Sequence, residues 1–186
     1  MPFEVEQKFP LPPNSLDVLG RLTALGGIPE QEVFQQDLYF NHPGHDFAQT
    51  DEALRIRTVG EHNVVTYKGP KLDPHIKTRE ELEVPLGDGR EVADNLGQIL
   101  LRLGFRAVRP VRKQRVIWNL AWNNRTWELA WDTVEGLGIF LEIETIAPNQ
   151  QDLPSAQAAL SDLARLIGLD NSERKSYLEM LLERGI

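Results

Sequence analysis

Polar and apolar residues alternate in eight short segments of this chain. A two-residue repeat is typical of strands, because successive side chains point to opposite faces of a sheet. We therefore predict strands over Phe3–Phe9, Asp37–Asn41, Ala53–Val59, Asn63–Lys68, Arg79–Val84, Lys113–Leu120, Thr126–Asp132 and Ile139–Ile146. Asn123 and Asn124 fall between two of these segments and predict a hairpin turn.

A second pattern, with apolar residues three or four positions apart, is typical of helices that pack one face on a core. It predicts helices over Leu16–Leu25, Glu91–Leu103, Ser155–Ile167 and Glu173–Leu182. The longest irregular connections in the strand-rich part are expected over Asn41–Glu52 and Gly69–Thr78. The content is α+β, and the length of 186 residues predicts a single domain over 1–186.

Charged residues occupy one face of most predicted strands. Glu4 and Glu6 share a face, and the apolar residues Val5 and Phe9 take the other. The charged set that follows the same rule contains seven acids and seven bases: Glu4, Glu6, Glu81, Glu83, Asp132, Glu142 and Glu144, with Lys8, Arg55, Arg57, Lys68, Arg79, Lys113 and Arg115. Glu128 shares a face with Asp132.

Taken strand by strand, this pattern fits an ordinary half-exposed antiparallel sheet with its charges in water. The four predicted helices change the interpretation, because their apolar stripes need a surface on which to dock. The apolar strand faces can receive them on the outside of a curled sheet, and the charged faces then point at one another. We predict an antiparallel, closed or nearly closed eight-stranded β-barrel with helices packed outside.

The composition restricts the function classes. The chain has 28 acidic and 20 basic residues, a formal net charge of -8, which argues against nucleic acid and anionic membranes as partners. There are no cysteines, so disulfides and thiolate metal sites are excluded. No apolar run is long enough to cross a membrane, and charges interrupt the N-terminal segment where a signal peptide would be apolar. We expect a cytoplasmic protein.

The facing acids and bases indicate a particular kind of ligand. Carboxylates suit hard cations such as Mg²⁺ and Mn²⁺, which prefer oxygen ligands. Arginine and lysine suit phosphate, and arginine can bind it through two parallel hydrogen bonds. A divalent metal together with a polyphosphate satisfies both sets. The chain has no Walker motif, so a P-loop mechanism has no support.

An ordered set of short motifs carries a resemblance to a known family. The motifs are Glu4-Val5-Glu6-Gln7-Lys8, Ala53-Leu54-Arg55-Ile56-Arg57, Thr66-Tyr67-Lys68-Gly69-Pro70, Arg79-Glu80-Glu81-Leu82-Glu83, Lys113-Gln114-Arg115, Asp132, Gly136-Leu137-Gly138 and Glu142-Ile143-Glu144. Together they resemble the CYTH family, also called the triphosphate tunnel metalloenzymes. That family includes class IV adenylyl cyclases, thiamine triphosphatases and inorganic triphosphatases. Gln36-Asp37-Leu38-Tyr39-Phe40 and three of these blocks resemble the class IV adenylyl cyclase-like branch.

The resemblance implies roles for individual residues. The implied catalytic residues are Glu4, Glu6, Lys8, Asp132, Glu142 and Glu144. The implied substrate-binding residues are Lys8, Arg55, Arg57, Lys68, Arg79, Lys113, Arg115 and Lys175, the last reaching the barrel from the final helix. The implied ligands of Mg²⁺ or Mn²⁺ are Glu4, Glu6, Glu81, Glu83, Asp132, Glu142 and Glu144.

The resemblance leaves several functions open. The branch implies conversion of ATP to cyclic AMP and pyrophosphate, whereas the wider family also implies hydrolysis of an inorganic or organic triphosphate. A module that binds polyphosphate or a nucleotide without turnover is the non-enzymatic alternative. The expected partner is a small-molecule triphosphate, namely ATP, inorganic triphosphate or thiamine triphosphate, and a homodimer is left open.

Overall fold

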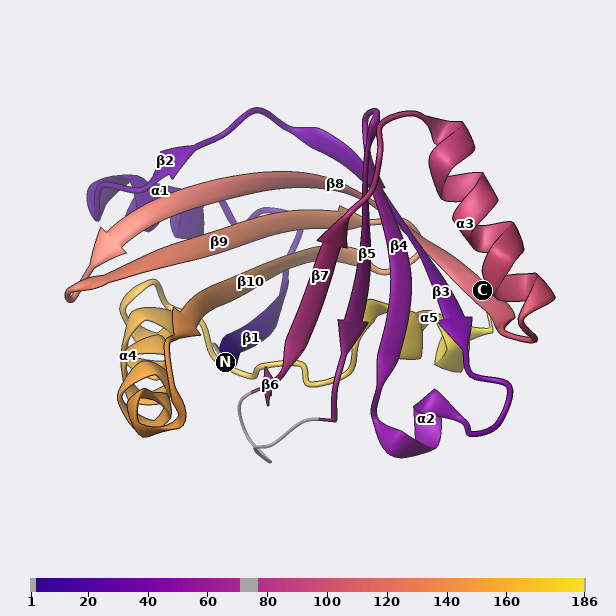
Figure 1. Ribbon diagram of the computed structural model, residues 1–186. Helices are drawn as coiled ribbons and strands as arrows, with labels where there is room; N and C mark the ends of the chain where they lie inside the picture. The colour runs from indigo at the N-terminus through magenta and orange to yellow at the C-terminus, as the bar shows by residue number, and fades with distance from the viewer. Residues whose placement is uncertain (1–2, 71–76, 186) are drawn as a thin grey trace.

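The computed structural model describes residues 3–70 and 77–185 of the chain (Figure 1). Its strands are β1 (Phe3–Leu11), β2 (Ile28–Pro29), β3 (Val33–Asn41), β4 (Ala53–Val59), β5 (His62–Lys68), β6 (Lys77–Arg79), β7 (Glu81–Pro85), β8 (Arg106–Trp122), β9 (Arg125–Val134) and β10 (Gly138–Ala147). The helices are α1 (Leu16–Ala24), α2 (Phe47–Thr50), α3 (Arg90–Arg102), α4 (Leu153–Leu166) and α5 (Tyr177–Arg184), with a 3₁₀ turn over Gln150–Asp152.

The strands form one antiparallel sheet that curls strongly. Its order is β6-β1-β10-β9-β8-β3-β4-β5-β7, and β2 adds to β8 outside this path. The two ends of the order, β6 and β7, are separated only by Glu80, so one stretch of chain pairs with β1 on one side and with β5 on the other. The sheet therefore nearly closes on itself, which confirms the predicted α+β, closed or nearly closed antiparallel barrel, although the described residues form ten strands rather than eight.

Only β4 has its predicted bounds, and three of the other predicted strands differ most from the structure. The structure splits Arg79–Val84 at Glu80, whose carbonyl accepts a hydrogen bond from the Gly69 amide instead of joining the ladder. The strand predicted to begin at Lys113 begins at Arg106 instead. It can run through Pro110 because this residue lies beside an irregularity in the pairing with β3, where a sheet tolerates proline. β3 begins at Val33 rather than at Asp37.

The loop predictions were correct only in part. The segment Asn41–Glu52 contains the short helix α2, which is capped by the Asp46 side chain. Of the predicted irregular segment Gly69–Thr78, residues 71–76 lie outside the described part of the chain.

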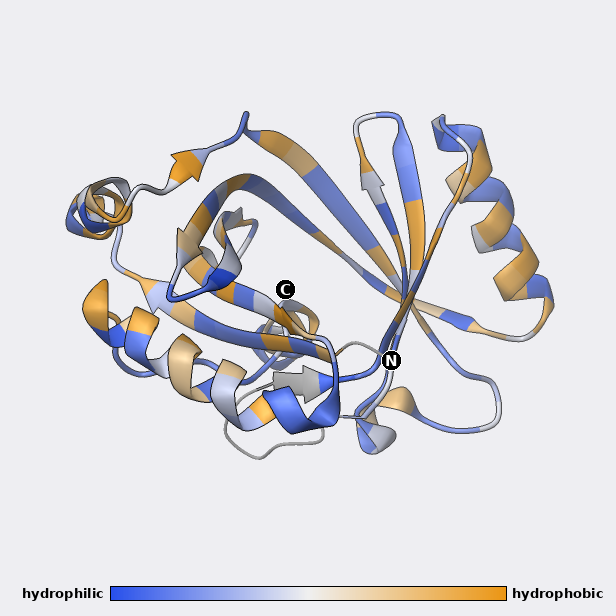
Figure 2. Ribbon diagram, turned by 60° about the vertical axis from the view of Figure 1, so that its left-hand side comes forward, coloured by the Kyte–Doolittle hydropathy of each residue, from blue (hydrophilic) through white to orange (hydrophobic). Residues whose placement is uncertain are grey.

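The main apolar core lies on the outer face of the curled sheet. It joins Val5, Leu129 and Leu141 of the strands to Leu22 of α1 and Leu160 of α4, all without solvent exposure. Alternate residues of the same strands point the other way, which gives the banded pattern visible in Figure 2. The prediction that helices dock on the outer, apolar face is correct for α1 and α4.

Helix α5 takes a different position. Its Tyr177, Met180 and Leu181 pack on Val111 and Phe140, which share strand faces with the charged residues rather than with the outer core. Figure 1 shows α5 beneath the arch of β8, β9 and β10. The last helix therefore covers one end of the charged inner face instead of lying outside the barrel.

The start of α5 was also predicted too early. The predicted helix began at Glu173, but the backbone amide of Glu173 bonds to the carbonyl of Lys8. Ser176 caps the helix through a capping box with Glu179, so regular helix starts only at Tyr177. Among the described residues, no helix is long and apolar enough to cross a membrane.

Candidate active site

The inner face of the sheet encloses a cavity of about 390 Å³. Thirteen of the residues implied by the family resemblance line it: Glu4, Glu6, Lys8, Arg55, Arg57, Lys68, Arg79, Glu81, Glu83, Lys113, Arg115, Glu142 and Glu144. Asp132 and Lys175 are not among the lining residues. Those that sequence reasoning did not assign to the site are Asp37, Tyr39, Glu128, Ile146, Ser176 and Tyr177.

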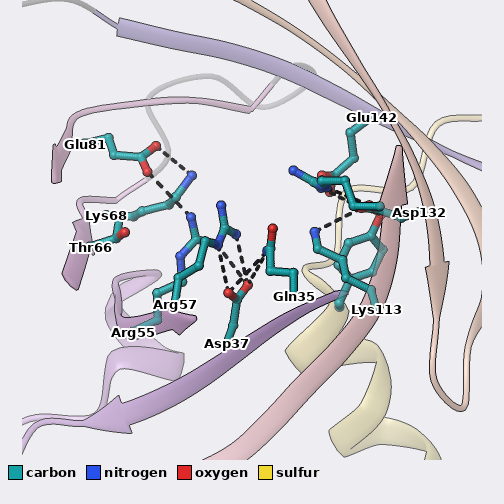
Figure 3. Close-up of polar contacts among 12 residues, drawn as sticks. Gln35, Asp37, Arg55, Arg57, Thr66, Lys68, Glu81, Lys113, Asp132 and Glu142 are labelled. Atoms are coloured by element: carbon teal, nitrogen blue, oxygen red, sulfur yellow. Dashed lines mark hydrogen bonds and ion pairs between the residues drawn. The ribbon is translucent and has the colours of Figure 1, made fainter. Parts of the chain in front are cut away.

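Asp37 anchors two of the bases on one wall of the cavity. Its carboxylate accepts hydrogen bonds from Arg57 Nε at 2.8 Å and Arg57 Nη2 at 2.9 Å, and lies 3.4 Å from Arg55 Nη1. Gln35 Nε2 donates to both carboxylate oxygens at 3.3 Å. Burial on its own raises the pKa of Asp37, but Arg57 and Arg55 outweigh it and hold the pKa well below its ordinary value. The charged carboxylate thus holds both guanidinium groups (Figure 3).

Lys68 forms a second group with two glutamates on the same side. Its Nζ lies 2.8 Å from Glu4 and 2.6 Å from Glu81. Burial lowers the pKa of Lys68, but the carboxylates of Glu4 and Glu81 together raise it by more, so the net shift of the pKa is upward. Lys68 is therefore a fixed positive charge inside the cavity.

Asp132 anchors the opposite group of bases. It accepts from Arg115 Nε at 2.7 Å and Nη2 at 2.6 Å, from Lys113 Nζ at 3.0 Å and from the Tyr177 hydroxyl at 2.9 Å. Arg115 also reaches Glu142 at 2.5 Å. With no exposed surface, Asp132 lies behind these bases, and it holds them as Asp37 holds its arginines (Figure 3).

The charges around Asp132 also shift the pKa values of Lys113 and Glu142. Burial and the neighbouring Arg115 lower the pKa of Lys113 to about 8, despite the attraction of Asp132. Burial and Glu6 would raise the pKa of Glu142, but Lys113 and Arg115 bring it down to about 2. Glu142 is therefore a carboxylate anion in this group.

Three glutamates form a row across adjacent strands on the remaining wall. Glu6 of β1 lies directly opposite Glu144 of β10, and Glu144 lies opposite Glu128 of β9. Directly opposed side chains have their Cβ atoms about 5 Å apart, and like charges in such positions repel. Burial, and then the carboxylates of Glu4 and Glu6, raise the pKa of Glu144 well above its ordinary value.

This carboxylate row (Glu6, Glu144 and Glu128) is the part of the cavity that suits a divalent cation. All its donors are oxygens, as Mg²⁺ and Mn²⁺ prefer, and a cation would relieve the repulsion between them. Within residues 3–70 and 77–185, no three acidic or histidine side chains are already gathered into a metal-binding group. The fit therefore rests on donor chemistry and strand register.

Of the two lysines Lys8 and Lys175, both implied to bind substrate, Lys8 lines the cavity and Lys175 does not. Lys8, only 1% exposed, places its Nζ 4.2 Å from the Tyr177 ring centroid, and Lys113 approaches the same ring at 5.0 Å. The side chain of Lys175, proposed as a phosphate ligand, instead pairs with Glu183 at 2.6 Å and is about half exposed. Its backbone carbonyl does contact this region, where it accepts a hydrogen bond from Lys8.

The residues that sequence reasoning missed had partial signals. Glu128 shares a strand face with Asp132, so alternation alone could have placed it in the cavity. Asp37 was the first residue of the predicted strand Asp37–Asn41, so no earlier residue of that strand showed which face its side chain shares. Tyr177 fell within the predicted helix Glu173–Leu182, which was expected outside the barrel, so its side chain was not placed in the cavity.

Comparisons with known proteins identify relatives of this chain. A candidate adenylate cyclase of Methanocaldococcus jannaschii is 40% identical over 165 residues, which is 88% of this chain and 90% of that protein. The adenylate cyclase CyaB of Aeromonas hydrophila is 32% identical over 183 residues, covering 94% of this chain and 86% of that protein. The solved structure of protein PH1819 of Pyrococcus horikoshii OT3 superposes with a TM-score of 0.83, at 37% identity, over 97% of this chain and 99% of the other. A family model described as the CYTH domain matches residues 2–177, and the chain therefore belongs to the CYTH family.

Proposed function

We propose that this protein is a metal-dependent enzyme that acts on triphosphates, and that its reaction is the conversion of ATP to cyclic AMP and pyrophosphate. One observation carries the proposal: a single cavity brings two anchored groups of bases together with a row of carboxylates. A triphosphate satisfies the bases, and a divalent metal satisfies the carboxylates. The name of the Aeromonas hydrophila relative supports the cyclase assignment.

The bases supply the phosphate contacts in this proposal. Arg57 and Arg115 are each held by an aspartate through two hydrogen bonds, so their guanidinium planes are fixed before substrate binds. Fixed groups lose little conformational entropy on binding and place the phosphates accurately. Arg55, Lys68 and Lys113 add positive charge along the same cavity, and we assign Lys8 to this set as well.

The carboxylates supply the metal ligands. Glu6, Glu144 and Glu128 would hold Mg²⁺ or Mn²⁺, and Glu4 lies two residues from Glu6 on the same strand face. When bound, the metal would neutralise charge on the phosphate oxygens and help to orient the reacting phosphorus. Asp132 has a different role here, because its oxygens already accept from Arg115, Lys113 and Tyr177. We assign it to the positioning of those bases.

The proposed cyclisation needs one bond to form and one to break. The ribose 3′-oxygen attacks the α-phosphorus, the bond from that phosphorus to the bridging oxygen of the β-phosphate breaks, and pyrophosphate leaves. The hydroxyl proton passes to a cavity carboxylate. Positioning and charge stabilisation supply most of the acceleration in phosphoryl transfer, and the fixed bases are suited to both.

Hydrolysis of a triphosphate is the second candidate. The observation that favours it is that the anchored bases all suit phosphate, so water could attack the terminal phosphorus in the same cavity. A non-catalytic polyphosphate-binding module is less well supported, because binding an anion alone gains nothing from the carboxylate row.

One experiment separates these reactions. The purified protein is incubated separately with ATP and with inorganic triphosphate, each with Mg²⁺ or Mn²⁺, and the products are identified by phosphorus NMR. Cyclic AMP with pyrophosphate supports the cyclase. Orthophosphate released without cyclic AMP supports the hydrolase, and no turnover of either substrate would leave only a binding role.

A further inference from the structure

Tyr177 lies where the last helix meets the charged inner face, and its side chain contacts three charged residues. Its hydroxyl donates a hydrogen bond of 2.9 Å to Asp132. The Nζ of Lys8 lies 4.2 Å from the centre of its ring, and the Nζ of Lys113 lies 5.0 Å from the same point. The contacted residues belong to β1, β8 and β9, so one aromatic side chain joins charged groups of three strands.

The ring attracts both ammonium groups. A lysine ammonium within about 6 Å of the centre of an aromatic ring is attracted by the negative charge on the ring face. Lys8 and Lys113 both meet this distance, and their side chains are almost fully buried. Because a buried charge is costly, each such attraction helps to keep the ammonium group in its place.

The segment just before Tyr177 holds Lys8 through two further contacts. The carbonyl of Lys8 accepts a hydrogen bond of 2.7 Å from the Glu173 amide, and its Nζ donates to the carbonyl of Lys175. Residues 173–177 therefore fix both the backbone and the ammonium group of Lys8. Lysine side chains have many rotamers, so these contacts reduce the conformational entropy that Lys8 would lose when a ligand binds.

Tyr177 can hold these groups because its own position is fixed. It is the first residue of α5, directly after Ser176, whose capping box with Glu179 sets where the helix begins. Its ring packs edge to face against Phe140, with the two ring centres 5.1 Å apart. A tyrosine side chain has only two torsions that place its ring, so this packing leaves the ring little freedom.

We propose that Tyr177 is a positioning residue for the proposed reaction, and that it holds the ammonium groups of Lys8 and Lys113 where both face the phosphates in the cavity. The inference rests on the proposed function, because it takes a triphosphate as the ligand. It adds that α5 contributes to phosphate binding through the two lysines that Tyr177 positions. The alternative is a role in packing alone, in which Tyr177 only fixes α5 against Phe140.

Three variants separate positioning from packing. Tyr177→Leu removes the ring, whereas Tyr177→Phe keeps the ring and removes the hydroxyl. Phe140→Leu is the matched control, because it removes the buried ring against which Tyr177 packs and leaves Tyr177 itself in place. Circular dichroism checks that each variant folds, and Tyr177→Met replaces Tyr177→Leu if the latter does not, since methionine adapts to irregular spaces.

Isothermal titration calorimetry measures the affinity of each variant for inorganic imidotriphosphate with Mn²⁺ at one temperature. The imido groups slow cleavage of this ligand. Because the ligand has no organic part, it probes the bases whichever reaction the cavity performs. Tyr177→Leu is measured a second time in a Lys8→Met background, which shows whether Tyr177 acts through that lysine.

The expected result is selective. Tyr177→Leu should weaken the ligand about tenfold, because two lysines that are no longer held must be immobilised on binding. Tyr177→Phe and Phe140→Leu should stay within about threefold of the wild type. In the Lys8→Met background, Tyr177→Leu should weaken the ligand only about threefold, because Lys113 alone remains to be positioned.

Four results overturn the positioning role while the cavity still binds triphosphate. They are unchanged affinity in Tyr177→Leu, equal weakening by Tyr177→Leu and Phe140→Leu, equal weakening by Tyr177→Leu and Tyr177→Phe, and an undiminished effect of Tyr177→Leu in the Lys8→Met background. If the wild-type protein binds no imidotriphosphate, the proposed function itself fails, and the proposal for Tyr177 with it.

Discussion

Replacing Asp37 by asparagine tests whether a buried carboxylate organises the wall of the cavity that we propose to bind phosphate. Asp37 is 2% exposed and bonds to Arg57 through both oxygens, with Arg55 close by. Removing one partner of a buried ion pair costs about 3–5 kcal/mol, because the other charge stays buried and unpaired. Asparagine keeps one oxygen acceptor, which recovers about 1 kcal/mol. We therefore expect Asp37→Asn to lower the free energy of unfolding by about 2–4 kcal/mol at pH 7.

The stability lost in Asp37→Asn should become smaller as the pH falls into strong acid. Since the folded-state pKa of Asp37 lies below its ordinary value of 3.8, the carboxylate contributes stability at every pH above that value. The contribution disappears as the pH falls from 3.8 toward the lower folded-state pKa, where both states become protonated. The stability difference between the wild type and Asp37→Asn should therefore be constant near neutrality and narrow in strong acid.

Urea denaturation followed by circular dichroism measures this difference at pH 7 and pH 3. The control variant is Asp152→Asn, which breaks another two-bond carboxylate pair, with Arg125, at a less buried position away from the cavity. More exposed pairs contribute about 0–1 kcal/mol, so the control should unfold close to the wild type. If Asp37→Asn is as stable as the wild type, or loses the same amount at both pH values, the anchoring role is refuted.

Three further predictions concern the site and the core. Glu144→Gln should abolish metal-dependent turnover of ATP, which a product assay measures. It should also raise the free energy of unfolding of the metal-free protein by about 0.5 kcal/mol in urea titration, because it removes repulsion in the carboxylate row. Arg57→Ala should lower kcat/KM about 30-fold or more through the loss of charged hydrogen bonds to phosphate, and unchanged kinetics would remove Arg57 from the site. Leu160→Ala should cost about 2–5 kcal/mol of stability in chemical denaturation, because the fully buried side chain joins α4 to the sheet, and a smaller loss would mean that the helix packs loosely.

The side of the sheet on which each charge lies could be predicted from alternation alone. Glu4 and Glu6 on β1, and Glu142 and Glu144 on β10, all line the cavity as their two-residue spacing indicated. Alternation also indicated the curled sheet, because the apolar faces needed a cover and the helices could provide it. These inferences depend on local pattern, which the sequence contains.

The contacts and burial of each side chain could not be predicted, because they depend on which strands pair and in what register. Asp132 lies on the expected face, but the register sets it directly opposite Arg115, whose guanidinium binds it. Similarly, Ser176 and its capping box decide where α5 begins, so Lys175 precedes the helix and turns to Glu183. Such outcomes follow from contacts between segments far apart in the chain.

The arrangement of the charges explains how the inner face can hold so many buried charged groups. Asp37 and Asp132 each neutralise a group of bases, which makes the burial of those bases tolerable without a ligand. The carboxylate row places like charges side by side across the strands, and it carries mutual repulsion. A cation on this row would lower the repulsion and attract the triphosphate, and the triphosphate in turn would attract the cation. Because such coupling is reciprocal, the proposed metal and the proposed triphosphate should each raise the affinity of the cavity for the other.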